Sequence, residues 1–79
     1  MTLHDLGLRA ARLATAQARL GGAQTIYIPV VLSNAASELG LPDFYAAAAL
    51  IRYHRRSGCL PSGSQEMPLE AALKILRDL

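Results

Sequence analysis

The chain has 79 residues, 52% of them hydrophobic and 5% aromatic, and carries a formal net charge of +2 at pH 7. This length allows one small domain, and the mildly basic charge permits a polyanionic partner without requiring one. The single cysteine, Cys59, excludes an intrachain disulfide framework and fits a reducing compartment. No apolar run approaches a membrane span, and arginines interrupt the N-terminal stretch where a secretory signal would lie. We therefore expect a soluble, cytoplasmic protein with no membrane partner.

Residues 3–20 are predicted to form an amphipathic helix. The positions along one face recur at spacings of three and four: Leu3, Leu6, Ala10, Leu13, Gln17 and Leu20. Thr2 and Asp5 form the pattern of a capping box at its start, and two consecutive glycines end it. Arg9, Arg12 and Arg19 share the opposite side. We interpret that side as a solvated face, with a contact to nucleic acid or another anionic surface as the alternative.

The stretch GGAQTIYIP at residues 21–29 is typical of a β-strand, because Ile, Tyr and Thr favour strands. Thr25 and Tyr27 point to one side of it, and Pro29 ends it because proline lacks a backbone N–H. The rest of the chain looks helical, and an unpaired strand leaves a row of backbone groups without hydrogen bonds. We therefore expect the strand to pair with its own copy across the two-fold axis of a homodimer. The expected dimer-interface residues are Gln24, Ile26 and Ile28.

The second half of the chain is predicted to contain three more helices. The first begins at Val30 or Ser33, with Ser33 or Asn34 as its N-cap, and runs to residue 39 before a Schellman-like glycine at position 40. The next runs from Pro42 to about residue 56. Residues 57–67 read as a turn-rich loop, and Pro68 opens a last helix to residue 79. The apolar face of the third helix is predicted to be Phe44, Ala47, Ala48 and Ile51.

The sequence offers little for catalysis or metal binding. His54 and Cys59 are five residues apart, and His4 is distant in sequence. A nucleophilic cysteine needs a base and an orienting group nearby, and a metal site needs three or four ligands. The Gly-Gly pair precedes a strand, which is the wrong context for a phosphate-binding loop. We expect no enzyme activity, no cofactor and no metal.

Residues 33–56 follow the plan of a helix-turn-helix, with a short helix, a glycine-containing turn and a second helix. In that interpretation the second helix is the recognition helix, and Tyr45 in its first turn faces base edges. Arg52, Arg55 and Arg56 share one side of the same helix and are candidates for phosphate contacts. The alternative is that these arginines complement the negative end of the helix dipole.

Two family resemblances point the same way. The Gly-Gly break and Tyr-Ile-Pro strand after an amphipathic helix, within residues 3–29, resemble the dimerisation domain of the phage middle-operon regulator (Mor) family of transcription activators. Residues 24–56 are more weakly similar to ribbon-helix-helix repressors, with TIYIP as the ribbon and ELGLPDF as the turn. Both resemblances imply an intertwined homodimer that binds double-stranded DNA. Both also imply that Thr25 and Tyr27 contact the DNA.

The sequence therefore predicts a mainly α fold with one short strand and four helices, the strand being paired across a dimer axis. The single domain, residues 1–79, divides into a helix-strand dimerisation segment (1–29), a helix-turn-helix-like pair (30–58), and a loop with a C-terminal helix (59–79). The leading functional hypothesis is a small dimeric DNA-binding transcriptional regulator. The alternative is a non-catalytic protein-interaction module, or a small phage-type inhibitor, that binds another protein and no DNA.

Overall fold

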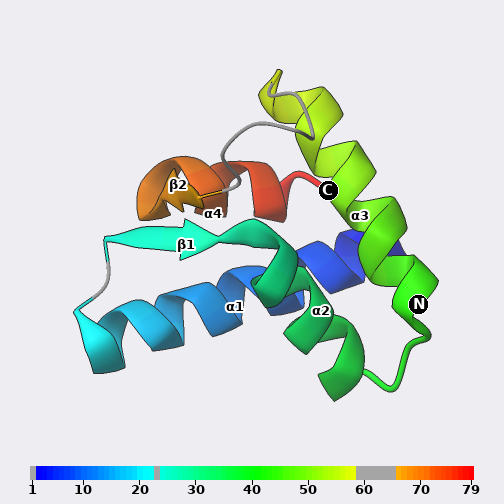
Figure 1. Ribbon diagram of the computed structural model, residues 1–79, viewed down its shortest axis with the longest axis horizontal. Coiled ribbons are helices and arrows are strands. Elements are labelled where there is room, and N and C mark those ends of the chain that lie inside the picture. The colour runs from blue at the N-terminus through cyan, green and yellow to red at the C-terminus, as the bar shows by residue number, and fades with distance from the viewer. Residues whose placement is uncertain (1, 23, 59–65) are drawn as a thin grey trace.

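The computed structural model describes residues 2–22, 24–58 and 66–79, and over this part of the chain it is mainly helical (Figure 1). The prediction of four helices is confirmed. In chain order the elements are α1 (Leu3–Gly21), β1 (Thr25–Tyr27), α2 (Ile28–Glu38), α3 (Asp43–Ser57), β2 (Glu66–Pro68) and α4 (Leu69–Arg77). None of the described helices is long and apolar enough to cross a lipid bilayer.

Helix α1 begins and ends where its capping residues predict. The Asp5 amide donates to the Thr2 hydroxyl over 3.2 Å, and the Thr2 amide donates to the Asp5 carboxylate over 2.9 Å. These reciprocal bonds form a capping box and satisfy amides that the first helical turn leaves without partners. At the other end Gly22 adopts a left-handed conformation with φ 64°, and its amide donates to the Ala18 carbonyl.

Strand β1 pairs with β2 of the same chain in an antiparallel two-stranded sheet. Ile26 lies opposite Met67 and Thr25 opposite Pro68, and the Leu69 amide donates to the Gln24 carbonyl over 2.9 Å. Because hydrogen-bonded and non-bonded pairs alternate, Pro68 occupies a non-bonded position and its missing N–H costs the ladder nothing. The expectation of a solitary strand is therefore wrong. Homodimerisation remains a prediction, but it is no longer needed to satisfy this backbone.

Helix α2 begins earlier than the sequence suggested. It starts at Ile28, directly after the strand, with Pro29 in the first turn, where proline needs no N–H partner. The predicted caps Ser33 and Asn34 are instead exposed positions within the helix. The predicted Schellman end is confirmed. Gly40 has φ 69°, and the Leu41 amide donates to the Ala36 carbonyl over 2.9 Å.

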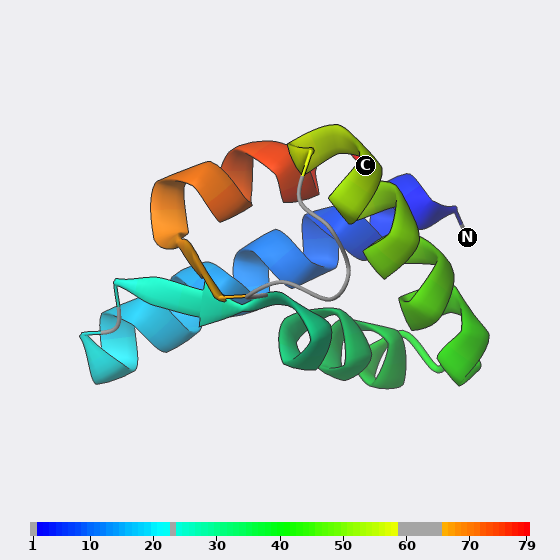
Figure 2. The same ribbon diagram turned by 45° about the horizontal axis from the view of Figure 1, so that its top comes forward.

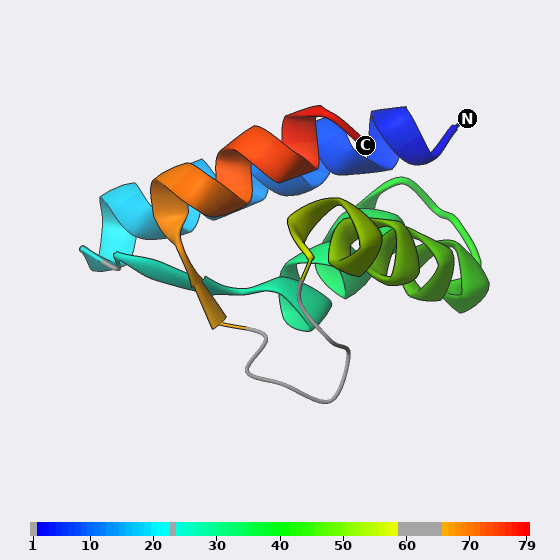
Figure 3. The same ribbon diagram turned by 90° about the horizontal axis from the view of Figure 1, so that it is seen from above.

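Helix α1 is the centre of the packing. It lies side by side and antiparallel with α4 (Figure 3), and it also packs against α2 and α3. Many of the buried residues are alanines, which allow the helices to approach closely: Ala10, Ala14, Ala35, Ala36, Ala49 and Ala72. The tightest approach is at Gly7, where a Cβ would overlap the Leu76 carbonyl oxygen and lie 2.9 Å from the Leu79 Cβ. The C-terminal residues therefore pack in the core of their own chain.

Candidate functional site

Helix α3 runs along one edge of the molecule (Figures 1 and 2). Its inner side contributes Ala49, Tyr53 and His54 to the core, with exposed fractions of 0%, 1% and 5%. The remaining inward positions, Ala46 and Leu50, are half-buried against the same core. Successive residues of an α-helix are rotated by 100° about its axis, so the positions of these inner residues determine which residues of α3 point outwards.

The outer side of α3 is an apolar stripe, made of Phe44, Ala47, Ala48 and Ile51 and ended by Arg55. Phe44 is 65% exposed and Ile51 is 54% exposed. The predicted apolar face of the helix is therefore turned away from the core of the chain. Ala49, Tyr53 and His54 occupy the core instead. Exposed apolar residues that are contiguous on one face mark interaction surfaces more often than isolated ones do.

The Phe44 side chain is held in place by its neighbour. Its ring stacks on that of Tyr45, with ring centroids 4.6 Å apart and planes 26° from parallel. Tyr45 itself is half-buried against the core, and its amide donates to the Pro42 carbonyl at the start of the helix. An exposed aromatic ring that is already ordered loses little conformational entropy when a partner covers it.

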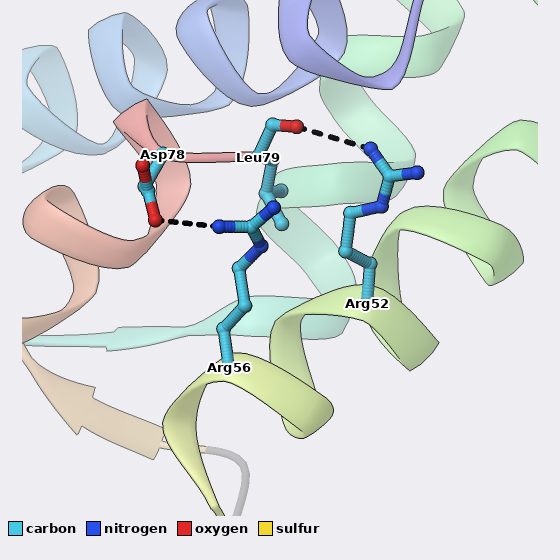
Figure 4. Close-up of polar contacts among 4 residues, drawn as sticks. All are labelled: Arg52, Arg56, Asp78 and Leu79. Atoms are coloured by element: carbon cyan, nitrogen blue, oxygen red, sulfur yellow. Dashed lines mark hydrogen bonds and ion pairs between the residues drawn. The ribbon is translucent and has the colours of Figure 1, made fainter.

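The arginines predicted to contact phosphates do not act together. Figure 4 shows that two of them reach from α3 to the end of α4. Arg52 Nη1 donates to the Leu79 carbonyl oxygen over 3.1 Å, and Arg56 Nη1 forms a 2.6 Å ion pair with Asp78 Oδ2. Both side chains therefore attach the C-terminal residues to α3. Arg55, exposed on the outer side, forms no ion pair with any residue that the structure describes.

The strand residues lie far from these arginines. Thr25 is opposite Pro68, directly before α4, whereas Arg52 and Arg56 bind residues directly after it. A helix of nine residues separates the two positions by about 14 Å. Tyr27 is half exposed on the same side of β1 as Thr25. The residues predicted to bind DNA are therefore spread over two regions of the surface.

The residues predicted for a dimer interface are divided as well. The side chains of Ile26 and Ile28 are 3% and 0% exposed and belong to the core of a single chain. Gln24 is exposed, and its carbonyl accepts the bond from the start of α4. The two isoleucines are therefore buried within one subunit, Ile26 on β1 and Ile28 at the start of α2.

A second surface feature is a shallow groove beside α1. The sequence indicated only part of this groove. Its apolar floor includes Leu8 and Ala11, and its rim carries Arg12, Arg19 and Arg77. The seven-residue spacing of the two arginines on α1 was visible in the sequence, but the contribution of α4 was not. None of the three rim arginines forms an ion pair with a residue in the described ranges. The groove can accept negatively charged groups.

Within residues 2–22, 24–58 and 66–79, no three His, Cys, Asp or Glu side chains gather as metal ligands would. His54 is buried, and neither of its ring nitrogens has a hydrogen-bond partner in this part of the chain. Cys59, the other residue considered for chemistry, lies outside the described residues.

Comparison with known proteins adds no constraint on the function. No family model, curated protein sequence or solved structure matches the chain. The outer stripe of α3 and the arginine groove beside α1 are the surface features from which a function can be inferred.

Proposed function

We propose that the chain is a non-catalytic protein-interaction module whose contact surface is the outer stripe of α3. The observation that carries this proposal is that Phe44 and Ile51, 65% and 54% exposed, lie on one face of a helix at the edge of the molecule. Aromatic and aliphatic side chains in such positions act as anchors at protein interfaces. Covering the stripe removes apolar surface from water, which is the main driving force of protein association.

The same face is poorly suited to reading DNA. A recognition helix presents hydrogen-bonding side chains to base edges, whereas the outer stripe of α3 offers a single donor side chain, Arg55. Asp43 at the start of the helix would repel phosphates, and Arg52 and Arg56 are engaged with the C-terminal residues. The helix-turn-helix order of α2 and α3 is present, but the surface chemistry favours a protein partner.

The test is site-specific photocross-linking in cells. Benzoylphenylalanine placed at position 44 preserves an aromatic ring there and reports what the stripe touches. We expect a defined adduct whose components mass spectrometry identifies and which reforms from purified components. The same probe at Ser33, an exposed position on α2, is the matched control. If position 44 yields no adduct beyond that of the Ser33 control, the stripe is not a contact surface and the proposal is overturned.

A DNA-binding regulator is the second candidate, and the arginine groove is the observation that favours it. Three guanidinium groups on its rim can each neutralise a backbone phosphate. We expect the affinity for random duplex DNA to fall with salt on a logarithmic slope of about −3. Replacing Arg12, Arg19 and Arg77 with glutamine should abolish this binding, while replacing Arg55 with glutamine should not. No binding at low salt would exclude this candidate.

A further inference from the structure

We infer that the partner of the α3 stripe is a second copy of this chain, bound through an antiparallel pair of α3 helices. This inference rests on the proposed function, because it identifies the occupant of the same surface. It moves the predicted homodimer interface from strand β1, which is paired within one chain, to the outer side of α3, where Phe44 and Ile51 are exposed. The proposed contact is made by four residues on the outer side of α3: Phe44, Ala48, Ile51 and Arg55.

The spacing of these positions is that of a helix-pairing seam. They follow one another at intervals of four, three and four residues, which keeps them on one line along the helix. On a straight helix they fall within about 60° of one another. All four point away from Ala49 and Tyr53, the residues that anchor the inner side of α3. The seam therefore extends over most of the fifteen residues of the helix, with Phe44, Ile51 and Arg55 exposed and Ala48 half-buried.

The seam is complementary to itself when two copies run in opposite directions. Ile51 of each copy then faces Ala48 of the other, so that each large side chain meets a small one. At both ends Phe44 of one copy faces Arg55 of the other, which places a guanidinium over an aromatic face. The stacking of Phe44 on Tyr45 presents that ring in an ordered position. A two-fold axis generates both halves of the contact from one surface, as in most homodimers.

A parallel pairing of the same helices is unfavourable. It would place the two Arg55 side chains together, and it would set Ile51 against Ile51 while leaving Ala48 opposite Ala48. Parallel helix dipoles would also lie side by side, with ends of like charge adjacent. The antiparallel arrangement removes each of these conflicts. The charge of Arg55 and the pairing of large with small side chains thus favour a second copy of the chain, bound with its α3 antiparallel.

The size of the seam indicates a weak dimer. One face of a single helix from each copy buries less than the roughly 1,200 Å² of total surface typical of specific, stable complexes. We therefore expect monomer and dimer to exchange, with dimer present at high micromolar concentration and lost on dilution. This concentration dependence distinguishes the contact from an obligate dimer, whose subunits do not fold alone.

The first experiment measures oligomeric state by sedimentation of the full chain from low micromolar to near-millimolar concentration. We expect a concentration-dependent monomer–dimer equilibrium that Ile51→Asp abolishes. Leu20→Asp is the matched control, since it removes a side chain that is 91% exposed on a different surface and should leave the dimer intact. Circular dichroism establishes that both variants are folded, as expected for exposed positions. A chain that is monomeric at every concentration, or a dimer that Ile51→Asp leaves unchanged, overturns the inference.

The second experiment determines the direction of the helices. Benzoylphenylalanine at position 44 of the purified chain should give an adduct with the mass of two chains, mapped by mass spectrometry to the turn that contains Arg55. An adduct mapped near position 44 of the other copy would refute the antiparallel arrangement. Adducts in cells with other proteins alone would refute the second copy while preserving the proposed interaction module. The absence of any adduct would refute both.

Discussion

Replacing Gly7 with alanine tests the packing on which the whole fold depends. Gly7 lies where α1 and α4 approach most closely, and a Cβ there would overlap the backbone carbonyl of Leu76 and crowd Leu79. A flexible side chain could rotate away from the added methyl group, but a backbone oxygen cannot. Helix α4 would have to move outward, and Leu79, which is 4% exposed, would lose part of its contact with α1.

The expected loss of stability follows from two opposing terms. Overpacking a close-packed site costs about 1–3 kcal/mol, and the rigid backbone obstacle places Gly7→Ala at the upper end. Alanine recovers about 1 kcal/mol because it favours a helix more than glycine does. The net loss is about 2 kcal/mol, a large share of the roughly 4–12 kcal/mol expected for a domain of this size. The melting temperature should fall by about 8–16 °C.

Thermal and urea unfolding followed by circular dichroism measure this change. Gly21→Ala is the matched control, because the Cβ that it would add meets no described atom within 4 Å apart from those of its own helical turn and chain neighbours. It lies in the last turn of the same helix, so it should leave stability unchanged or raise it by up to about 1 kcal/mol. If Gly7→Ala proves as stable as Gly21→Ala, the two helices do not meet at Gly7 and the arrangement of α4 on α1 is refuted.

Three further predictions concern polar groups. Hydrogen bonds from the Thr2 amide and hydroxyl lower the pKa of Asp5 in the folded chain. The contribution of Asp5 to folding stability is therefore present above its unfolded-state pKa near 4 and is lost as pH falls through its folded-state pKa. In thermal melts, the difference in melting temperature between the wild type and Asp5→Asn should disappear on acidification. His54→Leu should raise the free energy of unfolding by about 1 kcal/mol, because it removes buried ring nitrogens that have no partner among the described residues; an equally large loss in urea unfolding would contradict this. Arg52→Ala should cost about 1 kcal/mol through its part-buried bond, and Arg56→Ala less than about 0.5 kcal/mol through its exposed ion pair; equal losses in the same assay would count against the assigned contacts.

The helices were predictable because their ends carry local signals. The capping box of Thr2 and Asp5, the left-handed glycines after α1 and α2, and Pro42 before α3 each act within a few residues of the chain. Strand β2 has no such signal. It is three residues long, too short to show alternation, and its partner lies some forty positions earlier in the sequence. Such a long-range pairing depends on how α4 packs on α1. Patterns within a few residues of sequence contain no information about that packing.

The sequence left open which side of α3 faces the core, for a related reason. The helix carries apolar residues around most of its circumference, so periodicity predicts a helix without determining which side faces the core. The three-dimensional structure settles this: the large Tyr53 side chain is 1% exposed, on the side of α3 that packs against the rest of the chain. Phe44 and Ile51 are then turned outward by the fixed rotation per residue. A chain this small has enough apolar residues to fill its core from one side of α3, and the apolar surplus on the other side is what a second subunit would cover.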